Sequence, residues 1–164
     1  MLSWNEIRVD DERATRLLTE YFESRAADFP PELGTYRTTF PVAADFVNPR
    51  GVFLVVSEAS EDLGCGGIRR IDSTDDGVRY EVKHLYLRPA ARGRGLGRGM
   101  LARLEERARG LGADELVLDT NASLTAAAGL YRSSGFEDIP AYNDNPNATK
   151  WYLKRLDRTE AVGF

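Results

Sequence analysis

The sequence predicts one domain of the α/β (α+β) class, with a mixed central sheet that carries helices on its faces. The length of 164 residues matches a single ordinary domain. Apolar residues make up 42% and charged residues 29% of the chain, as in soluble globular proteins. Strand-like and helix-like hydrophobic patterns alternate, and no repeat, low-complexity tract or linker interrupts them. We therefore expect a single domain over residues 1–164.

The chain is expected to begin with a strand over Leu2–Val9 and a helix. Asp10 or Asp11 offers the helix a side-chain cap, and Pro30-Pro31 stops it. The apolar stripe of this helix repeats at helical spacing and comprises Ala14, Leu17, Leu18, Tyr21, Phe22 and Ala26. Residues 30–50 then form a proline-rich loop with several aromatic side chains, which is typical of a lid or a binding wall.

Three strand candidates with short links follow and predict an antiparallel meander. Gly51–Ser57 is a continuous apolar run, which suits burial on both faces. Cys65–Ile71 is a shorter candidate, and Val78–Leu87 is longer and alternates. The turns between the three are marked by Glu61-Asp62 and by Asp72–Gly77.

The second half changes to longer, helix-like periods. A helical apolar face runs from Leu96 to Leu111 and ends at Gly110 and Gly112. The later elements are a strand Glu115–Thr120, a helix Leu124–Ser133, and strands Phe136–Ile139 and Lys150–Leu156, with a polar loop over residues 140–149 between the last two.

Composition argues against several functional classes. The chain has 22 Lys+Arg against 26 Asp+Glu, a net charge of -4, which does not favour a dedicated nucleic-acid binder. Cys65 and His84 are its single cysteine and histidine, so we expect no metal site built from several of either. We interpret both as packed residues. No secretory signal and no membrane-length apolar run is visible, so we expect a cytoplasmic protein.

The most informative stretch is a glycine-rich turn that follows a strand and opens a helix. It reads Arg92, Gly93, Arg94, Gly95, Leu96, Gly97, Arg98, Gly99. Glycines let the backbone approach a ligand closely, and the first amides of a helix favour negative charge. Together with three arginines, the turn suits a pyrophosphate. Its spacing fits neither the G-x-G-x-x-G fingerprint nor the P-loop.

The turn does fit the pattern [Q/R]-x-x-G-x-[G/A], filled by Arg92, Gly95 and Gly97. At this point the chain resembles the GNAT family of acetyl-CoA-dependent N-acetyltransferases. Three further stretches resemble the family's central strand, its fifth strand and its "LYxxxGF" signature: Glu81–Pro89, Leu116–Asn121 and Ala128–Phe136. The resemblance implies a mostly antiparallel sheet with a splayed parallel pair, flanked by about four helices.

The resemblance also implies acetyl-CoA (coenzyme A) as the acetyl donor. The implied cofactor-binding residues are Leu85, Tyr86, Leu87, Arg92, Gly93, Arg94, Gly95, Leu96, Gly97, Arg98, Asn121 and Tyr131. The Leu85 amide is the candidate donor to the thioester oxygen. Asn121 has a second interpretation as a plain helix cap.

Two residues are the candidates for catalysis. Glu81 lies 11 residues before Arg92, the offset of the catalytic glutamate in the histone-acetylating branch of the family, and is the candidate base. The alternative is a solvated glutamate, or a partner for Lys83 or an arginine. Tyr131 aligns with the family tyrosine that hydrogen-bonds the CoA sulfur, and a phenol with a pKa of ~10 keeps its proton for the departing thiolate. Its alternative is a core aromatic.

The acceptor amine is expected between residues 30–50 and residues 140–149, where the family places it. The candidate substrate-binding residues are Arg37, Phe40, Tyr142 and Asn143. They suit a small polar amine with an apolar portion. Arg37 is either a partner for a substrate carboxylate, as in an amino acid, or an ordinary surface charge.

The leading hypothesis is direct acetyl transfer to the primary amine of a small molecule in a ternary complex. One alternative is a non-catalytic acyl-CoA-binding or sensing module, which has no use for Tyr131. Others are acetylation of a protein amine, and a basic surface that contacts nucleic acid and comprises Arg88, Arg92, Arg94 and Arg98. No metal and no membrane are expected, and a homodimer is compatible with the family.

Overall fold

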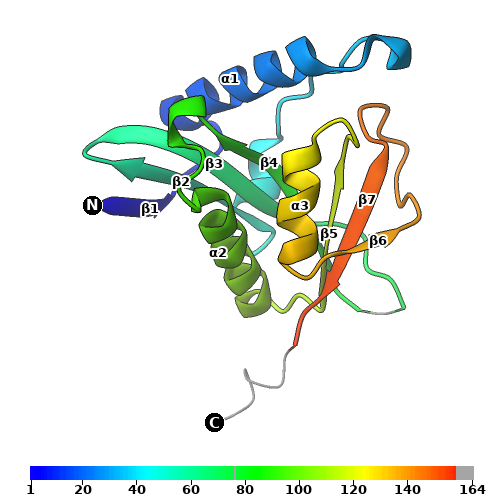
Figure 1. The fold of residues 1–164 in the computed structure, drawn as a ribbon. Coiled ribbons are helices and arrows are strands. Elements are labelled where there is room, and N and C mark those ends of the chain that lie inside the picture. The colour runs from blue at the N-terminus through cyan, green and yellow to red at the C-terminus, as the bar shows by residue number, and fades with distance from the viewer. Residues whose placement is uncertain (76, 158–164) are drawn as a thin grey trace.

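A computed structural model describes residues 1–75 and 77–157 of the chain. Seven strands in those ranges form one sheet in the order β1-β2-β3-β4-β5-β7-β6 (Figure 1), and every neighbouring pair is antiparallel except β4 and β5. The strands are β1 (Leu2–Glu6), β2 (Gly51–Glu58), β3 (Glu61–Arg70), β4 (Arg79–Leu87), β5 (Glu115–Thr120), β6 (Glu137–Ile139) and β7 (Lys150–Arg155). The predicted mixed sheet with one parallel pair is confirmed.

Three α-helices lie against this sheet within the described ranges. They are α1 (Glu12–Asp28), α2 (Leu96–Gly110) and α3 (Thr125–Ser133). Short 3-10 helices span Pro31–Leu33, Ala43–Phe46 and Pro89–Ala91. The expectation of about four helices is therefore close to the observed number.

The sheet has a hydrophobic cluster on each face. Leu17 of α1 belongs to one cluster with Phe53 of β2, whereas Leu104 of α2 belongs to the other with Leu54. Tyr131 of α3 lies in the same cluster as α2. Because successive strand residues point to opposite faces, β2 is buried on both sides, as its continuous apolar run predicts.

The hairpin between β2 and β3 differs from the sequence expectation. Glu61-Asp62 was predicted as the turn, but both residues belong to β3. The turn is made by Ala59 and Ser60, whose φ angles are +51° and +69°. A two-residue turn of type I′ requires positive φ at both positions, and neither alanine nor serine favours positive φ. β3 is therefore longer than predicted.

The parallel strands β4 and β5 pair over a short stretch and then diverge. Their register runs from Arg79 opposite Glu115 to Glu81 opposite Val117. At the joined end, the Arg79 guanidinium lies 2.7 Å from the Glu115 carboxylate, which is fully buried. Beyond Glu81, residues 83–87 of β4 have no strand beside them on the β5 side in the described part of the chain. The fold thus leaves one edge of β4 open in the centre of the sheet.

A β-bulge lies on β4 where it leaves β5. The register of β3 against β4 shifts between Cys65 and Gly67, so that one residue of β3 faces His84 and Leu85 together. His84 has a φ of +59°, outside the region that strands use. Bulges bend a strand and re-aim its groups. This one therefore bends β4 immediately before Leu85.

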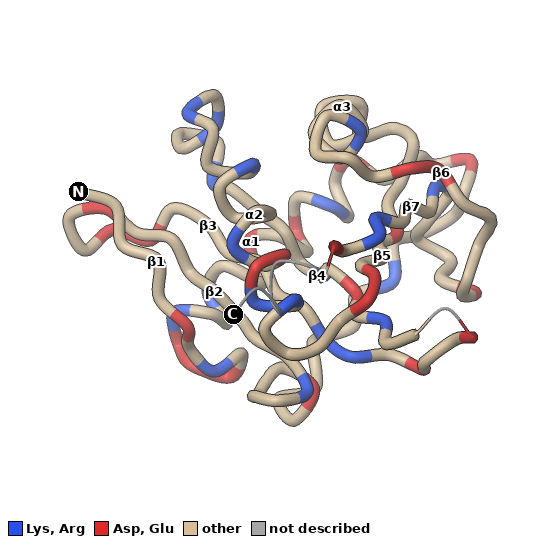
Figure 2. Tube along the Cα trace, turned by 90° about the horizontal axis from the view of Figure 1, so that it is seen from below, with Lys and Arg blue, Asp and Glu red and all other residues tan. Residues whose placement is uncertain are grey.

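Acidic and basic residues are interspersed along the chain trace rather than segregated (Figure 2). Among the described residues, no helix combines the length and the apolar character that crossing a membrane requires.

Candidate active site

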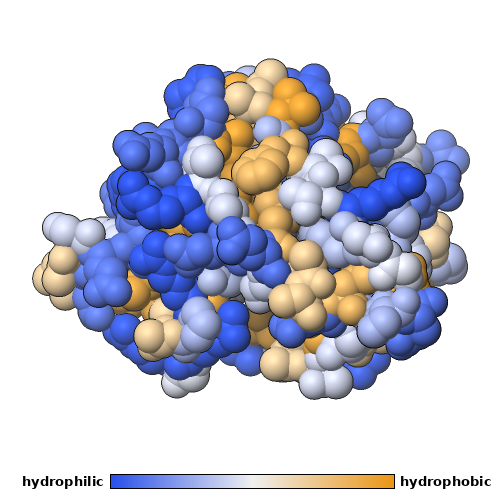
Figure 3. All heavy atoms as spheres, turned by 90° about the horizontal axis from the view of Figure 1, so that it is seen from above, coloured by the Kyte–Doolittle hydropathy of each residue, from blue (hydrophilic) through white to orange (hydrophobic). Residues whose placement is uncertain are grey.

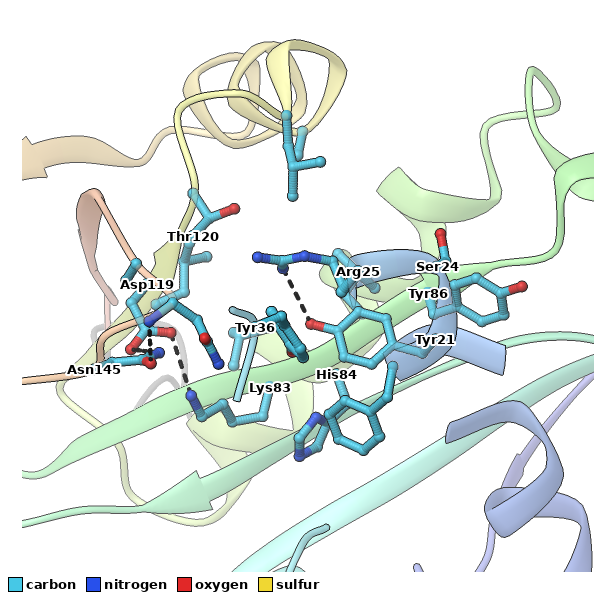
Figure 4. Close-up of a pocket in the computed structure, with 18 of the residues that line it drawn as sticks. Tyr21, Ser24, Arg25, Tyr36, Lys83, His84, Tyr86, Asp119, Thr120 and Asn145 are labelled. Carbon is cyan, nitrogen blue, oxygen red and sulfur yellow. Dashed lines mark hydrogen bonds and ion pairs between the residues drawn. The ribbon is translucent and has the colours of Figure 1, made fainter. Parts of the chain in front are cut away.

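A cavity of about 780 Å³ opens where β4 and β5 diverge. Side chains from α1, β4, β5 and the loop 140–149 converge on it (Figure 4). On the face seen from above, apolar residues form a band between polar margins (Figure 3). The lining residues predicted from the sequence are Leu85, Tyr86, Leu87, Arg92, Gly97, Tyr131, Arg37, Phe40 and Asn143. The cavity thus joins residues assigned to the donor with residues assigned to the acceptor.

The start of α2 forms one end of this cavity. Gly95 is the N-cap residue, adopts a left-handed conformation with a φ of +76°, and provides no side-chain cap. The first amides of α2 are therefore available to an anion. No heavy atom lies within 4 Å of the position where a Cβ of Gly93 or Gly95 would stand, so the turn has free space above it. Together with the open edge of β4, this end fits an extended ligand that carries a pyrophosphate.

The arginines of the turn have separate roles. Arg92 donates from Nε to the Leu87 carbonyl at 3.1 Å and lines the cavity, so it links the turn to the end of β4. Arg94 forms an exposed ion pair with Glu58 at 3.1 Å. Arg98 donates to the Ser133 hydroxyl of α3 at 2.8 Å. Neither Arg94 nor Arg98 lines the cavity.

Four other residues predicted for cofactor binding lie off the cavity lining. Gly93, Gly95 and Leu96 stand beside it at the start of α2. Asn121 is buried, accepts from the Ser123 amide at 3.0 Å, and donates to the Asn147 carbonyl at 3.3 Å. Neither contact caps α3, whose N-cap residue is Leu124 and which has no side-chain cap, so the interpretation of Asn121 as a plain helix cap does not match the structure.

Tyr131 lies in the cavity wall on α3. Its ring packs against Phe136 and Tyr152, with centroid distances of 6.0 and 5.7 Å, and only 7% of the residue is exposed. Burial raises the pKa of Tyr131 well above the ordinary value of a phenol. Its hydroxyl therefore carries a proton at every physiological pH.

Glu81 does not lie where a base facing the cavity is expected. Its carboxylate is buried and pairs with Arg69, directly opposite on β3, at 2.9 Å. Tyr142 donates its hydroxyl to the other oxygen at 2.6 Å. Burial and this carboxylate raise the pKa of Tyr142, which keeps the donor protonated. Neither Glu81 nor Tyr142 lines the cavity, so the structure matches the alternative in which Glu81 is the partner of an arginine.

The wall opposite α2 is built from two loops. The Arg37 carbonyl accepts a hydrogen bond from the Asn147 side chain at 2.7 Å, and the Arg37 amide donates one to the same side chain at 2.9 Å. Asn143 donates to Asp119 at 2.7 Å and accepts from the Trp151 indole at 2.9 Å. Phe40 is half exposed and stacks edge-on against Phe22 at 5.0 Å. The loops that the sequence assigned to the acceptor therefore do meet.

An ion pair spans the gap between the diverging strands. Lys83 of β4 lies 3.2 Å from Asp119 of β5, and the Asp119 carboxylate also accepts from Asn143 and Asn145. Burial raises the pKa of Asp119, but the Lys83 ammonium and the two amides outweigh burial and hold that pKa below its usual range. Asp119 is therefore a permanent negative charge in the cavity wall.

His84 and Cys65 occupy apolar surroundings next to the bulge. The His84 ring contacts Tyr21, Phe22 and Phe46, with centroid distances of 5.9, 5.5 and 5.9 Å. Burial lowers the pKa of His84 to about 3, so the imidazole is neutral near pH 7. Burial raises the pKa of the Cys65 thiol far above neutrality, which removes the thiolate that an acyl-cysteine needs.

Helix α1 contributes side chains to this site that the sequence pattern does not indicate. Tyr21 and Phe22 were assigned to the apolar core stripe, yet both line the cavity together with Arg25. The available signal was the spacing of Tyr21 and Arg25, one turn apart on the same helix face. That spacing does not reveal that β4 and β5 diverge beneath the helix.

Comparison with known proteins identifies the family. The model of the acetyltransferase (GNAT) family matches residues 11–136. An IAA acetyltransferase of Azospirillum brasilense is 40% identical over 86 residues, which are 52% of this chain and 54% of that protein. The N-alpha-acetyltransferase RimI of Mycobacterium tuberculosis is 30% identical over 125 residues, 74% of this chain and 77% of that protein.

The match to the Azospirillum protein thus spans about half its length. Solved structures share the fold at low identity. A GNAT-family acetyltransferase of Staphylococcus aureus has a TM-score of 0.74 at 16% identity. The match covers 94% of this chain and 100% of the Staphylococcus chain. One from Elizabethkingia anophelis, solved with acetyl-CoA bound, has a TM-score of 0.65 at 16% identity, covering 94% and 98%. The family-model match covers most of the chain and all of the donor half of the cavity, and the chain belongs to the GNAT acetyltransferase family.

Proposed function

We propose that this protein transfers an acetyl group from acetyl-CoA directly to the primary amine of a small molecule, with both substrates bound together. The observation that carries the proposal is the continuity of one cavity, whose lining runs from Arg92 and Gly97 past Tyr131 to Arg37 and Asn143. Holding both reactants in one cavity converts a bimolecular step into an effectively unimolecular one. No acyl-enzyme is required, because the buried Cys65 thiol is protonated.

The donor is held by main-chain groups. The amides at the uncapped start of α2 bind the pyrophosphate, and the open edge of β4 over residues 85–87 pairs with the pantetheine arm. Acetyl-CoA, when bound, supplies the acetyl group as an activated thioester. The Leu85 amide, which follows the bulge at His84, donates to the thioester oxygen and stabilises the negative charge that develops there.

Tyr131 acts as the acid of the reaction in this proposal. Its buried phenol keeps its proton at neutral pH, gives it to the sulfur as the C–S bond breaks, and takes up the proton that the attacking nitrogen loses as the amide forms. A raised pKa weakens a phenol as an acid, but a thiolate leaving group needs only a partner that donates a hydrogen bond as its charge develops.

The acceptor amine must lose a proton before it attacks. The carboxylates in the cavity lining are Asp28 and Asp119. Asp119 is held ionised by its ion pair with Lys83 and by two amides, and its lowered pKa makes it a poor acceptor of the proton. We therefore assign deprotonation to solvent reaching the cavity and give Glu81 no part in it, because its carboxylate is occupied by Arg69 and Tyr142.

Initial-rate kinetics test this proposal. When acetyl-CoA and an amine are varied together, a ternary complex gives intersecting double-reciprocal lines, whereas an acyl-enzyme gives parallel lines. We expect intersecting lines for the wild-type protein. We also expect kcat to fall strongly in the Tyr131→Phe variant. Parallel lines would contradict the proposal in favour of an acyl-enzyme. No CoA release with any amine despite tight acetyl-CoA binding would contradict it in favour of a sensing module.

A peptide N-terminus is the second candidate acceptor, favoured by the similarity to the N-alpha-acetyltransferase RimI. The discriminating comparison is a set of free small amines against short peptides of varied first residue. Higher kcat/KM for free amines supports the small-molecule proposal, and higher kcat/KM for peptides replaces it.

A further inference from the structure

Helix α1 presents a guanidinium to the acceptor side of the cavity, and among the described residues no carboxylate forms an ion pair with it. Arg25 is half-buried, lines the cavity, and points toward its centre in Figure 4. Its contacts are aromatic: Nη1 lies 3.5 Å from the Tyr21 hydroxyl, and Cζ lies 5.3 Å from the centre of the Tyr36 ring. By contrast, Arg13 and Arg16 on the same helix pair with Asp62 and Glu12.

The other charged side chains in the cavity wall differ from Arg25 in their ion-pair partners or in their exposure. Lys83 pairs with Asp119, and Arg69 pairs with Glu81. Asp28, one turn beyond Arg25 on α1, is exposed and forms no ion pair with it in the described structure. The Arg37 side chain is exposed at the rim and, among the described residues, has no carboxylate partner. The acceptor side therefore carries an excess of positive charge on Arg25 and Arg37.

We propose that Arg25 binds a carboxylate of the acceptor, so that the substrate is a small amine that also bears a carboxylate, as a free amino acid does. This inference rests on the proposed function and names the substrate class of that same site. A guanidinium offers two parallel donors that match the two oxygens of a carboxylate. Tyr21 and Tyr36 hold the Arg25 side chain in place before the ligand arrives, which lowers the entropy lost on binding.

The position of Arg25 places such an amine near the reacting groups. Arg25 and Tyr131 line the same cavity, from α1 and α3 respectively. A carboxylate at Arg25 leaves the neighbouring ammonium facing the gap between β4 and β5, where Asp119 carries its negative charge. Phe22, Phe40 and Tyr36 supply an apolar wall for the remainder of the molecule.

The test compares acceptors that differ only in the carboxylate. The twenty common amino acids, their carboxamides and the corresponding amines without a carboxyl group are assayed with acetyl-CoA by CoA release. We expect kcat/KM for the best amino acid to exceed that of its carboxamide by about 10- to 100-fold, since hydrogen bonds to charged groups are worth that factor.

Variants of Arg25 then assign the effect. Arg25→Gln is expected to raise KM for the amino acid about 10- to 100-fold, to leave the carboxamide within about twofold, and to leave acetyl-CoA binding unchanged. Arg25→Lys keeps the positive charge but lacks the two parallel donors of a guanidinium. Its KM for the amino acid should therefore lie between those of wild type and Arg25→Gln. Arg16→Gln on the same helix, exposed and outside the cavity, is the matched control and should behave as wild type.

Two results overturn the inference. The first is a kcat/KM for the carboxamide or the carboxyl-free amine that equals the kcat/KM for the amino acid. The second is an equal rise in KM for the amino acid and for its carboxamide in Arg25→Gln. If acetyl-CoA itself fails to bind, the proposed function is contradicted. Calorimetric titration with the amino acids alone then still tests whether Arg25 binds a carboxylate. Binding to wild type and not to Arg25→Gln supports it, whereas equal or absent binding refutes it.

Discussion

The main chain of Arg37 and the side chain of Asn147, 110 residues apart, are joined by a reciprocal pair of hydrogen bonds. The Arg37 amide donates to Asn147 Oδ1 at 2.9 Å, and Asn147 Nδ2 donates to the Arg37 carbonyl at 2.7 Å. The pair resembles one rung of an antiparallel sheet and fastens the two loops that wall the acceptor side of the cavity. The main-chain groups of Asn147 bond separately to Asn145 and Asn121.

Replacing this side chain should loosen the acceptor side alone. Asn147→Ala removes two hydrogen bonds worth about 0.5–1.5 kcal/mol each, so KM for the acceptor is expected to rise about tenfold while the Kd of acetyl-CoA is unchanged. Steady-state kinetics and calorimetry give the two values, with the exposed Asn5→Ala on β1 as a control. Equal weakening of both substrates would show that the pair supports the whole cavity instead.

Tyr131→Phe separates an enzyme from a sensing module. Loss of a general acid is expected to lower kcat by about 10²- to 10⁴-fold with acetyl-CoA binding retained, because the ring still packs against Phe136. Tyr152→Phe is a matched control, since the buried Tyr152 hydroxyl has no hydrogen-bond partner in the described structure. Unchanged kcat in Tyr131→Phe would remove the acid role.

Glu81→Gln distinguishes a structural carboxylate from a base. The ion pair with Arg69 and the hydrogen bond from Tyr142 predict a loss of about 1–3 kcal/mol in the free energy of unfolding, with an unchanged shape of the pH profile of kcat. Urea unfolding and pH-dependent kinetics measure the two quantities. A loss of kcat that grows at low pH would restore Glu81 as the base.

His84 should make the protein sensitive to mild acid. Its pKa is about 3 in the folded protein and about 6.5 when unfolded, so below pH 6.5 the unfolded chain binds a proton that the native chain does not. Stability is full above pH 6.5 and falls by about 1.4 kcal/mol per pH unit below it. Urea unfolding between pH 7 and 5 measures the slope.

His84→Asn, which tolerates a positive φ, should lose this part of the pH dependence. The chain has a single histidine, so the slope has no other histidine to arise from. Parallel stability curves for the two proteins would contradict the packed, neutral state of the imidazole.

The sheet, the order of its elements and the glycine-rich turn were predictable because their signals are local. The helical face from Leu96 to Leu111 and the apolar run of β2 each define an element without reference to the rest of the chain. The turn at Ala59 and Ser60 was not predictable, because neither residue favours positive φ.

The surroundings of Glu81 and Arg25 depend on register and could not be predicted in the same way. Alternation assigns Glu81 to a face of β4, but only the pairing with β3 brings Arg69 opposite to it. Arg25 reaches the cavity only because β4 and β5 part beyond Glu81. A cross-strand partner and a gap between strands are both non-local, which is why the sequence pattern reveals neither the Arg69 partner of Glu81 nor the place of Arg25 in the cavity wall.

The most direct test of the account is calorimetric titration of the purified protein with acetyl-CoA, with ATP and NAD as competitors for a general phosphate site. We predict saturable binding of acetyl-CoA that far exceeds either competitor. Gly95→Val should abolish it, because a β-branched residue is strained at a φ of +76°, whereas Gly110→Ala at the far end of α2 should not. Absent binding, or equal binding of all three nucleotides in wild type, would contradict the assignment of the turn and with it the acetyltransferase proposal.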